Sequence, residues 1–371
     1  MTIPAKTKVA IIGGGLAGLN ASRLLHRAGI SFQLFEARDR LGGRILTVNE
    51  LGTPDDDGFD LGPSWFWPDM QPAIGDLVEE LGLTAFAQHS HGDMLYQRDF
   101  RENPGRMRGM TQEPQSMRLF GGSAALVHAV ANSLPSAALH IRVAVTQLRL
   151  TDAGIDLTLE RSGQPAEQIT ASYVLAAIPP RLLAAAIGFE PALPTENLNL
   201  WRNTPTWMAP HAKFFAIYDR PFWREAGLSG AAQSMVGPLG EIHDATTATG
   251  RAALFGFVGV PAEHRASVGE EVLIQAAVRQ LTHLFGSEAA HPRATLLKDW
   301  AADAYTATPA DASASGHPSP NRVEWVTTPW SQRLLLAGSE TSPTDPGYLA
   351  GAVEASKRAA QTVICKNIAN G

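Results

Sequence analysis

The sequence predicts an α/β protein built of two domains. Residues 9–12 form a short apolar run of the kind found in buried parallel strands. A glycine-rich turn and a helical pattern that stops at Gly29 follow it, and a second apolar run, residues 32–35, ends at Glu36. With 371 residues, the chain is long enough to bury a large core and to divide into two domains.

The turn after the first strand fits the pattern G-x-G-x-x-G through Gly13, Gly15 and Gly18. Such glycines allow a tight turn, close approach to a pyrophosphate and close packing of helix on strand. Glu36 follows Gly18 by 18 residues, where a carboxylate can accept hydrogen bonds from ribose hydroxyls. This order of elements favours a Rossmann-like dinucleotide-binding domain over a chance glycine turn in another α/β protein. The predicted contacts are Gly13, Gly14, Gly15, Ala17, Gly18 and Glu36.

The residues after Glu36 complete the pattern E-A-R-x-R-x-G-G-R, which ends at Arg44. This stretch resembles the flavin-containing amine oxidase superfamily, which includes monoamine, polyamine and L-amino-acid oxidases; the chain would be a short member of bacterial type. The resemblance implies bound FAD, with Gly42, Gly43 and Arg44 against its pyrophosphate and Arg38 near the adenosine ribose. A planar guanidinium suits phosphate geometry, which agrees with that assignment.

Later segments extend the resemblance to most of the chain. Residues 60–65, DLGPSW, are similar to a family stretch near the flavin ring, and residues 338–352 are similar to its C-terminal flavin motif. Phe66 and Trp67 fit either the flavin surroundings or the core. The further cofactor contacts implied are Gly62, Pro63, Ser64, Trp65, Val145, Trp300, Gly338, Glu340, Gly347, Tyr348 and Leu349.

The domains are expected to be discontinuous. Residues 1–70, 119–180 and 325–371 form the predicted FAD-binding domain. Residues 71–118 and 181–324 form a predicted substrate domain with a mixed sheet. Residues 84–117 are polar and irregular, and they are fewer than in larger family members, so a shortened lid is expected.

Lys213 and Tyr348 are the catalytic candidates. Lys213 opens the stretch K-x-x-x-x-Y-x-x-P-F-W, in which the lysine of relatives holds a water beside flavin N5. A lysine within an apolar strand needs partners for its ammonium group; the alternative is an edge-strand lysine that points to solvent. Tyr348 resembles the family tyrosine that packs at the flavin face.

The second aromatic wall of the family's substrate cage is missing from the expected place. Trp300 and Tyr305 align with a family tryptophan and tyrosine. In this register Pro309 stands where monoamine oxidases carry a flavin-linking cysteine, and Ala310 stands where they carry the second cage tyrosine. The resemblance therefore implies noncovalent FAD and a cage that is incomplete or completed elsewhere.

Composition and charge exclude several other classes. The net charge is −6 with no basic block, which argues against a nucleic-acid partner. The single cysteine, Cys365, rules out an internal disulfide and fits a reducing compartment, so a cytoplasmic location is expected. No apolar run is long enough for a membrane span, and no histidines cluster at metal-ligand spacing, so neither a membrane nor a metal is expected.

The predicted function is FAD-dependent oxidation of an amine or amino acid to an imine, with reoxidation by molecular oxygen to give peroxide. Three alternatives remain at this point. The chain could be a desaturase or isomerase of the same superfamily, a dehydrogenase that passes electrons to a partner, or a binding protein stabilised by FAD without turnover. The substrate, the acceptor and the oligomeric state are not specified by the sequence.

Overall fold

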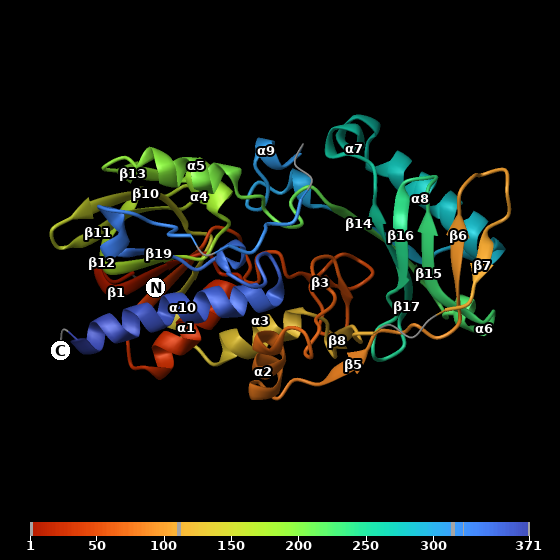
Figure 1. Cartoon of the computed structure of the whole chain (residues 1–371), viewed down its shortest axis with the longest axis horizontal. Helices are drawn as coiled ribbons and strands as arrows, with labels where there is room; N and C mark the ends of the chain where they lie inside the picture. The colour runs from red at the N-terminus through yellow and green to blue at the C-terminus, as the bar shows by residue number, and fades with distance from the viewer. Residues whose placement is uncertain (1–2, 110–112, 313–315, 322, 370–371) are drawn as a thin grey trace.

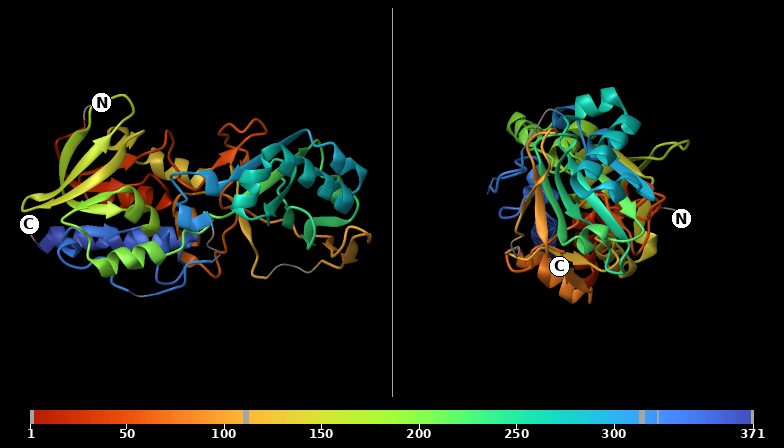
Figure 2. Two further views of the ribbon diagram at one scale, coloured as in Figure 1. Left: turned by 90° about the horizontal axis from the view of Figure 1, so that it is seen from above. Right: turned by 90° about the vertical axis from the view of Figure 1, so that its right-hand side faces the viewer.

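The computed structural model describes residues 3–109, 113–312, 316–321 and 323–369. Two large β-sheets form two lobes that lie side by side along the long axis of the molecule (Figure 1, Figure 2). Helices and strands alternate in the first lobe, and antiparallel strands dominate the second. The predicted α/β class is confirmed.

The first sheet is built around β1 (Lys6–Ile12). It lies between β2 (Phe32–Glu36) and β12 (Glu167–Ala176), parallel to both, and β9 (Leu139–Ile141) and β19 (Leu334–Leu336) extend the parallel part. On the edge of β12 opposite β1, residues 167–171 pair antiparallel with β11. The remaining strands are β10 (Ala144–Thr151), β11 (Gly154–Glu160) and β13 (Gly188–Glu190). Because parallel strands end at one edge, the loops that follow β1 and β2 meet there.

Helices cover both faces of the first sheet, since alternate side chains of β1 enter two different cores. Val9 and Ile11 point into one core, and Ala10 and Ile12 point into the other. The first core is closed by α1 (Leu16–Arg27), α2 (Pro72–Glu80), α3 (Ala124–Asn132) and α10 (Leu349–Ala369). The second core is closed by α4 (Pro180–Ala186) and α5 (Thr195–Asn203).

The second sheet has the order β18-β14-β17-β16-β15-β6-β7. Its strands are β6 (Asp93–Gln97), β7 (Gly105–Met107), β14 (Ala212–Tyr218), β15 (Leu228–Ser234), β16 (Leu239–Asp244), β17 (Ala252–Val258) and β18 (Ala294–Asp299). Helix α8 (Glu270–Phe285) packs on one face, with α6 (Phe222–Glu225) and α7 (Ala262–Val268) nearby. The other face packs Phe215 and Phe255 against Phe59 of the first half of the chain.

Two short strand pairs and several short helices lie outside the two large sheets. The strand pairs are β3 (Thr47–Val48) with β4 (Phe59–Asp60), and β5 (Ala85–Ala87) with β8 (Met117–Leu119). The remaining helices are η1 (Ser136–Ala138), η2 (Ser287–Ala290), η3 (Trp300–Ala302), α9 (Pro309–Ala312), η4 (Trp330–Gln332) and η5 (Ser339–Thr341). No helix in the described part of the chain combines the length and apolar character that a bilayer crossing requires.

The domain limits expected from the sequence differ from the packing at two places. The expected limit at residue 71 assigns α2 to the second domain, yet Ile74 of this helix is buried in the first core. The expected limit at residue 180 assigns α5 to the second domain as well. Trp201 of this helix is nevertheless buried in the second core of the first sheet. The rest of the proposed division stays a prediction.

Residues 84–117, expected to be irregular, contain β5, β6 and β7 and the start of β8. Strands β6 and β7 extend the second sheet at its edge. All three residues of β7 are exposed, so the strand carries no alternation of apolar and polar residues that could reveal it in the sequence.

Candidate functional site

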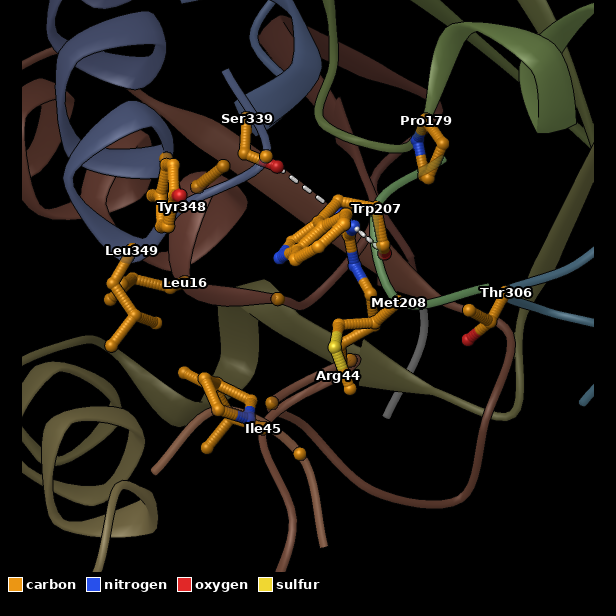
Figure 3. Close-up of a pocket in the computed structure, with 18 of the residues that line it drawn as sticks. Leu16, Arg44, Ile45, Pro179, Trp207, Met208, Thr306, Ser339, Tyr348 and Leu349 are labelled. Atoms are coloured by element: carbon orange, nitrogen blue, oxygen red, sulfur yellow. Dashed lines mark hydrogen bonds between the residues drawn. The ribbon is translucent and has the colours of Figure 1, made fainter. Parts of the chain in front are cut away.

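One elongated cavity of about 490 Å³ runs from the edge of the first sheet to the second sheet. Its walls come from the loops after β1 and β2 and from the start of α10 (Figure 3), and from β14, β16 and β17 of the second sheet. Sixteen residues proposed from the sequence lie in its wall: Gly13, Gly15, Ala17, Glu36, Arg38, Gly42, Gly43, Arg44, Gly62, Pro63, Ser64, Trp65, Lys213, Gly347, Tyr348 and Leu349.

The glycine turn brings the backbone of the β1–α1 loop to the cavity without side chains in the way. Gly13 has a φ of +102°, a backbone conformation that favours glycine. A Cβ on Gly18 would lie 1.9 Å from the carbonyl oxygen of Gly13, so only glycine allows α1 to pack this closely. At Gly15 a built Cβ would lie 3.8 Å from the carbonyl oxygen of Gly42, an ordinary van der Waals contact, so the protein's own packing does not require glycine at this position.

Glu36 is fixed at the end of β2 by two backbone donors. Its Oε2 accepts a hydrogen bond from the N–H of Gly14 at 2.7 Å, and its Oε1 accepts one from the N–H of Arg38 at 2.8 Å. These contacts orient the carboxylate at the cavity wall. Gly14 itself does not line the cavity; its structural contact is this hydrogen bond.

Arg38 joins this end of the cavity to the segment after β18. Its guanidinium group donates to the carboxylate of Asp303 and to Thr306 Oγ1, the latter at 2.9 Å. Asp303 also accepts a hydrogen bond from Lys298 Nζ at 3.1 Å. Burial raises the pKa of Asp303, but Arg38 and Lys298 outweigh it and hold this pKa below its usual value.

Arg44 lines the cavity, and its guanidinium group donates hydrogen bonds to two separate segments of the chain. It donates to both carboxylate oxygens of Glu340, at 2.6 and 3.2 Å, and to the carbonyl oxygen of Trp207 at 2.8 Å. Ser339 Oγ accepts another hydrogen bond at 3.0 Å. Glu340 is buried behind Arg44 and does not line the cavity, so its contact with any ligand there would be indirect.

Lys213 is buried in the second sheet, on β14, which is paired on both sides, with β17 and with β18. Its side chain is 1% exposed, which excludes the alternative of an edge-strand lysine in solvent. Its Nζ donates to the carbonyl oxygens of Asp60 at 2.7 Å and Gly62 at 2.9 Å, and to Ser64 Oγ at 2.9 Å. These acceptors match the three donors of an ammonium group.

The surroundings of Lys213 act on its charge in opposite directions. Burial lowers the pKa of Lys213 to about 7; the Asp60 carboxylate acts to raise it, and the Arg118 cation acts to lower it further. The Nζ atom also lies 4.4 Å from the centre of the Phe255 ring, a contact that favours the cation. The lysine is thus a titratable group in the cavity wall whose pKa lies near neutral pH.

Aromatic side chains surround Tyr348 at the start of α10. Its ring lies 6.3 Å from the Trp67 ring in an edge-to-face arrangement and 4.5 Å from the His317 ring. Trp67 and Trp207 line the same cavity, and Figure 3 shows Trp207 beside Arg44 and Met208 with Tyr348 and Leu349 on the α10 side. Ala310 lies exposed on α9, outside the cavity wall, so aromatic groups from other segments occupy the surroundings of Tyr348.

Several residues proposed as cofactor contacts do not line the cavity: Gly14, Gly18, Val145, Trp300, Gly338 and Glu340. Val145 is buried in the core between the first sheet and α4. Trp300 is fully buried, and its Nε1 donates to the carbonyl oxygen of Leu61 at 2.9 Å. Direct cofactor contact by these residues stays a prediction, and the structure gives each of them a packing or hydrogen-bonding role.

Other wall residues were not proposed from the sequence, among them Trp207, His211, Glu241, Phe257, Thr306 and Ser339. Glu241 is the most informative, because it is a carboxylate on β16 in the half of the cavity that the second sheet forms. Its neighbour Ile242 is buried while Glu241 is half exposed, an alternation typical of a strand with one buried face. No motif of the sequence marks it.

No group of three or more His, Cys, Asp or Glu side chains arranged to hold a metal ion occurs among the described residues. The histidines near the cavity are packed against aromatic rings instead: His211 and His317 both contact Trp207. Burial lowers the pKa of His211, and the Arg265 cation adds to this effect, so its imidazole is neutral at neutral pH.

Comparison with known proteins gives a consistent result. The family model described as "flavin containing amine oxidoreductase" matches residues 104–364, and the model of an NAD(P)-binding Rossmann-like domain matches residues 11–81. A protein of Mycobacterium tuberculosis named as a flavin-containing monoamine oxidase is 27% identical, over 97% of each chain.

Solved structures show the same fold. A putrescine oxidase bound to putrescine superposes with a TM-score of 0.78 at 20% identity, covering 97% of this chain and 99% of the other. Cyclohexylamine oxidase from Brevibacterium oxydans gives the same TM-score and coverage at 22% identity. The two-lobed arrangement with a Rossmann-like sheet is therefore shared with these proteins along almost their whole length.

Proposed function

Because the chain belongs to the family of flavin-containing amine oxidoreductases, we propose that it oxidises the C–N bond of a small amine to an imine. Molecular oxygen takes up the two electrons and two protons and leaves as hydrogen peroxide, and water hydrolyses the released imine. The chain is a flavin-dependent oxidoreductase with FAD as its cofactor. When bound, FAD supplies the two-electron redox chemistry, while the protein positions the substrate and tunes the site.

The residues of the cavity fit FAD along its length. The start of α1 brings Gly15 and Leu16 into the cavity wall, and the positive end of the helix dipole there suits a pyrophosphate. Glu36 and Arg38 would hold the ribose at one end of the cavity. Gly42, Gly43 and Arg44 would face the pyrophosphate, and residues 62–65, together with Gly347 and Tyr348, would border the ring.

The observation that carries the proposal is the place of Lys213. It is a fully buried amine in the cavity wall, held by Asp60, Gly62 and Ser64 and surrounded by aromatic rings. A positive charge or an oriented donor at this point would stabilise negative charge that develops in the cavity during oxidation. The aromatic surroundings of Tyr348 suit an amine in its approach.

Two measurements test the proposal. A panel of primary and secondary amines and amino acids is mixed with the purified holoenzyme under argon, and loss of flavin absorbance is followed. The same panel is tested in air with a peroxide-coupled assay. We expect bleaching by amines and stoichiometric peroxide. Bleaching without peroxide would favour a dehydrogenase with another acceptor, and no bleaching by any amine would refute amine oxidation.

A further inference from the structure

Glu241 lies in a row of side chains that begins at Lys213. In the second sheet Lys213 is paired with Phe257 on β17, and Phe257 is paired with Glu241 on β16. Directly opposed residues of antiparallel strands project from the same face of the sheet. Two strand spacings of about 4.8 Å therefore place the backbone of Glu241 about 10 Å from that of Lys213. All three residues line the cavity.

The carboxylate of Glu241 has an oxygen without a partner among the described residues. His243 contacts Oε1 at 2.7 Å, and no hydrogen bond is formed by Oε2 within the described chain. The contact with His243 lowers the pKa of Glu241 against the opposing effect of burial, so the group is charged at neutral pH.

Glu36 is the other carboxylate in the described cavity wall, and both of its oxygens already accept backbone hydrogen bonds. Glu241 is the carboxylate that the second sheet contributes to the described cavity wall, and its Oε2 accepts no hydrogen bond from the described residues.

The surface between Lys213 and Glu241 is apolar. The Phe257 side chain separates them within the row, and the Trp65 ring lies 6.5 Å from the Phe257 ring on the loop that faces the sheet. The neighbouring row continues this surface, with the His243 ring stacked on the Phe255 ring at 5.3 Å. A ligand that extends from the Lys213 end to Glu241 would place its middle part on these rings. Methylene groups suit that apolar surface, and charged groups do not.

We propose that Glu241 determines specificity by binding a second cationic group of the substrate, so that the enzyme prefers unbranched α,ω-diamines to monoamines and to amino acids. The inference rests on the proposed oxidation of amines and names the substrate class. The C–N bond at one end of the diamine is oxidised, and the ammonium at the other end donates a hydrogen bond to the free Oε2 of Glu241. An amino acid that extends a carboxylate towards this point meets a like charge and is rejected.

The test uses the holoenzyme, a series of α,ω-diamines and the monoamines of matching chain length. The measured quantity is the ratio of kcat/KM for each diamine to that for its monoamine. Glu241→Gln keeps the shape and the contact with His243 but removes the charge. We expect the ratio to fall about ten- to hundredfold, as for loss of a charged hydrogen bond. The loss should fall mainly on KM, because the contact lies away from the bond that reacts.

Two further variants control this result. Glu241→Asp retains the charge and should restore part of the preference, whereas Glu263→Gln removes an exposed carboxylate on α7 and should leave the ratio unchanged. Calorimetric titration of the oxidised holoenzyme with a diamine under argon measures binding separately from turnover. Tighter binding by the wild type than by Glu241→Gln supports the inference even if no amine is oxidised, a result that would refute only the proposed reaction.

The inference is overturned if the wild type shows no preference for diamines. It is also overturned if Glu241→Gln leaves both the ratio and the calorimetric affinity unchanged.

Discussion

Lys213 is the residue with the sharpest expected effect on activity. Lys213→Met keeps the apolar stem and removes the charge and the three donated hydrogen bonds. We expect the variant to bind FAD and to bleach with amine under argon, but to regain its flavin absorbance in oxygenated buffer at least tenfold more slowly, because a stabilising cation or donor is lost. Stopped-flow mixing of the reduced protein with oxygen measures this rate. A rate equal to that of the wild type would exclude the role.

The same lysine predicts how stability changes with pH. Its pKa is about 7 in the folded protein and 10.5 in an unperturbed lysine, so between these values the unfolded chain binds more protons. The free energy of unfolding should therefore rise with pH, by up to about 1.4 kcal/mol per unit from this group. Urea unfolding at about pH 7 and pH 9 would show the rise in the wild type and a smaller one in Lys213→Met. Equal slopes would contradict the lowered pKa.

The site residues differ in how far the sequence could reveal them. Gly13, Glu36 and Arg44 stand in a continuous pattern whose chemistry requires those residue types at that spacing, and the structure places all three at the cavity. Glu241 stands in no such pattern, because its position depends on the pairing of β16 with β17 and of β17 with β14. Trp300 is the opposite case, because the sequence proposed it as a cofactor contact. Its ring is fully buried in the protein and does not line the cavity.

At the scale of elements, one loop receives hydrogen bonds from two parts of the second lobe. Residues 60–64 accept from Lys213 on β14 and, through the Leu61 carbonyl, from Trp300 in η3. Trp300→Phe removes the indole donor and leaves that buried carbonyl without it, at a cost of about 1–3 kcal/mol. We expect a lower free energy of unfolding in urea and a several-fold higher dissociation constant for FAD, because this loop borders the cavity.

Trp201→Phe is the matched control for that variant. Trp201 is equally buried, and its Nε1 donates to the carbonyl oxygen of Trp325 in the core of the first lobe, outside the cavity wall. The control should lose less stability, because Asn197 Nδ2 still donates to the Trp325 carbonyl at 3.2 Å, and it should leave the FAD affinity unchanged. If both variants weakened FAD binding equally, the hydrogen bond to Leu61 would have no specific part in shaping the site.

Elements with a strong internal pattern were the predictable ones. The apolar run 9–12 lies within β1, and the apolar run 32–35 lies within β2. Strands β15 and β16 were not foreseen; β15 contains Ser229, Gly230 and Gln233, and β16 contains Gly240 and two acidic residues, Glu241 and Asp244. Such strands are stabilised by pairing with β17 and β6 rather than by their own composition, so local sequence predicts them poorly.

At the scale of the whole molecule, the cavity wall is shared by the two lobes, and the ion pairs that Arg38 and Lys298 form with Asp303 connect them beside it. A ligand that fills this cavity contacts both lobes and binds the folded chain only. Its binding should therefore raise the stability of the whole protein by mass action, by about 2.7 kcal/mol at a hundredfold excess over the dissociation constant.

The last prediction concerns how FAD is held. Pro309, aligned with the flavin-linking cysteine of monoamine oxidases, offers no thiol and lies exposed on α9, and Cys365, the single cysteine of the chain, is exposed on α10 away from the cavity wall. We expect acid to release intact FAD and the apoprotein to regain both colour and thermal stability when FAD is added back. The melting temperature should rise with FAD concentration in a single transition, because the ligand couples both lobes. Flavin that remained on the acid-precipitated polypeptide would contradict noncovalent binding, and a melting temperature that did not change with FAD would contradict a cavity formed by both lobes.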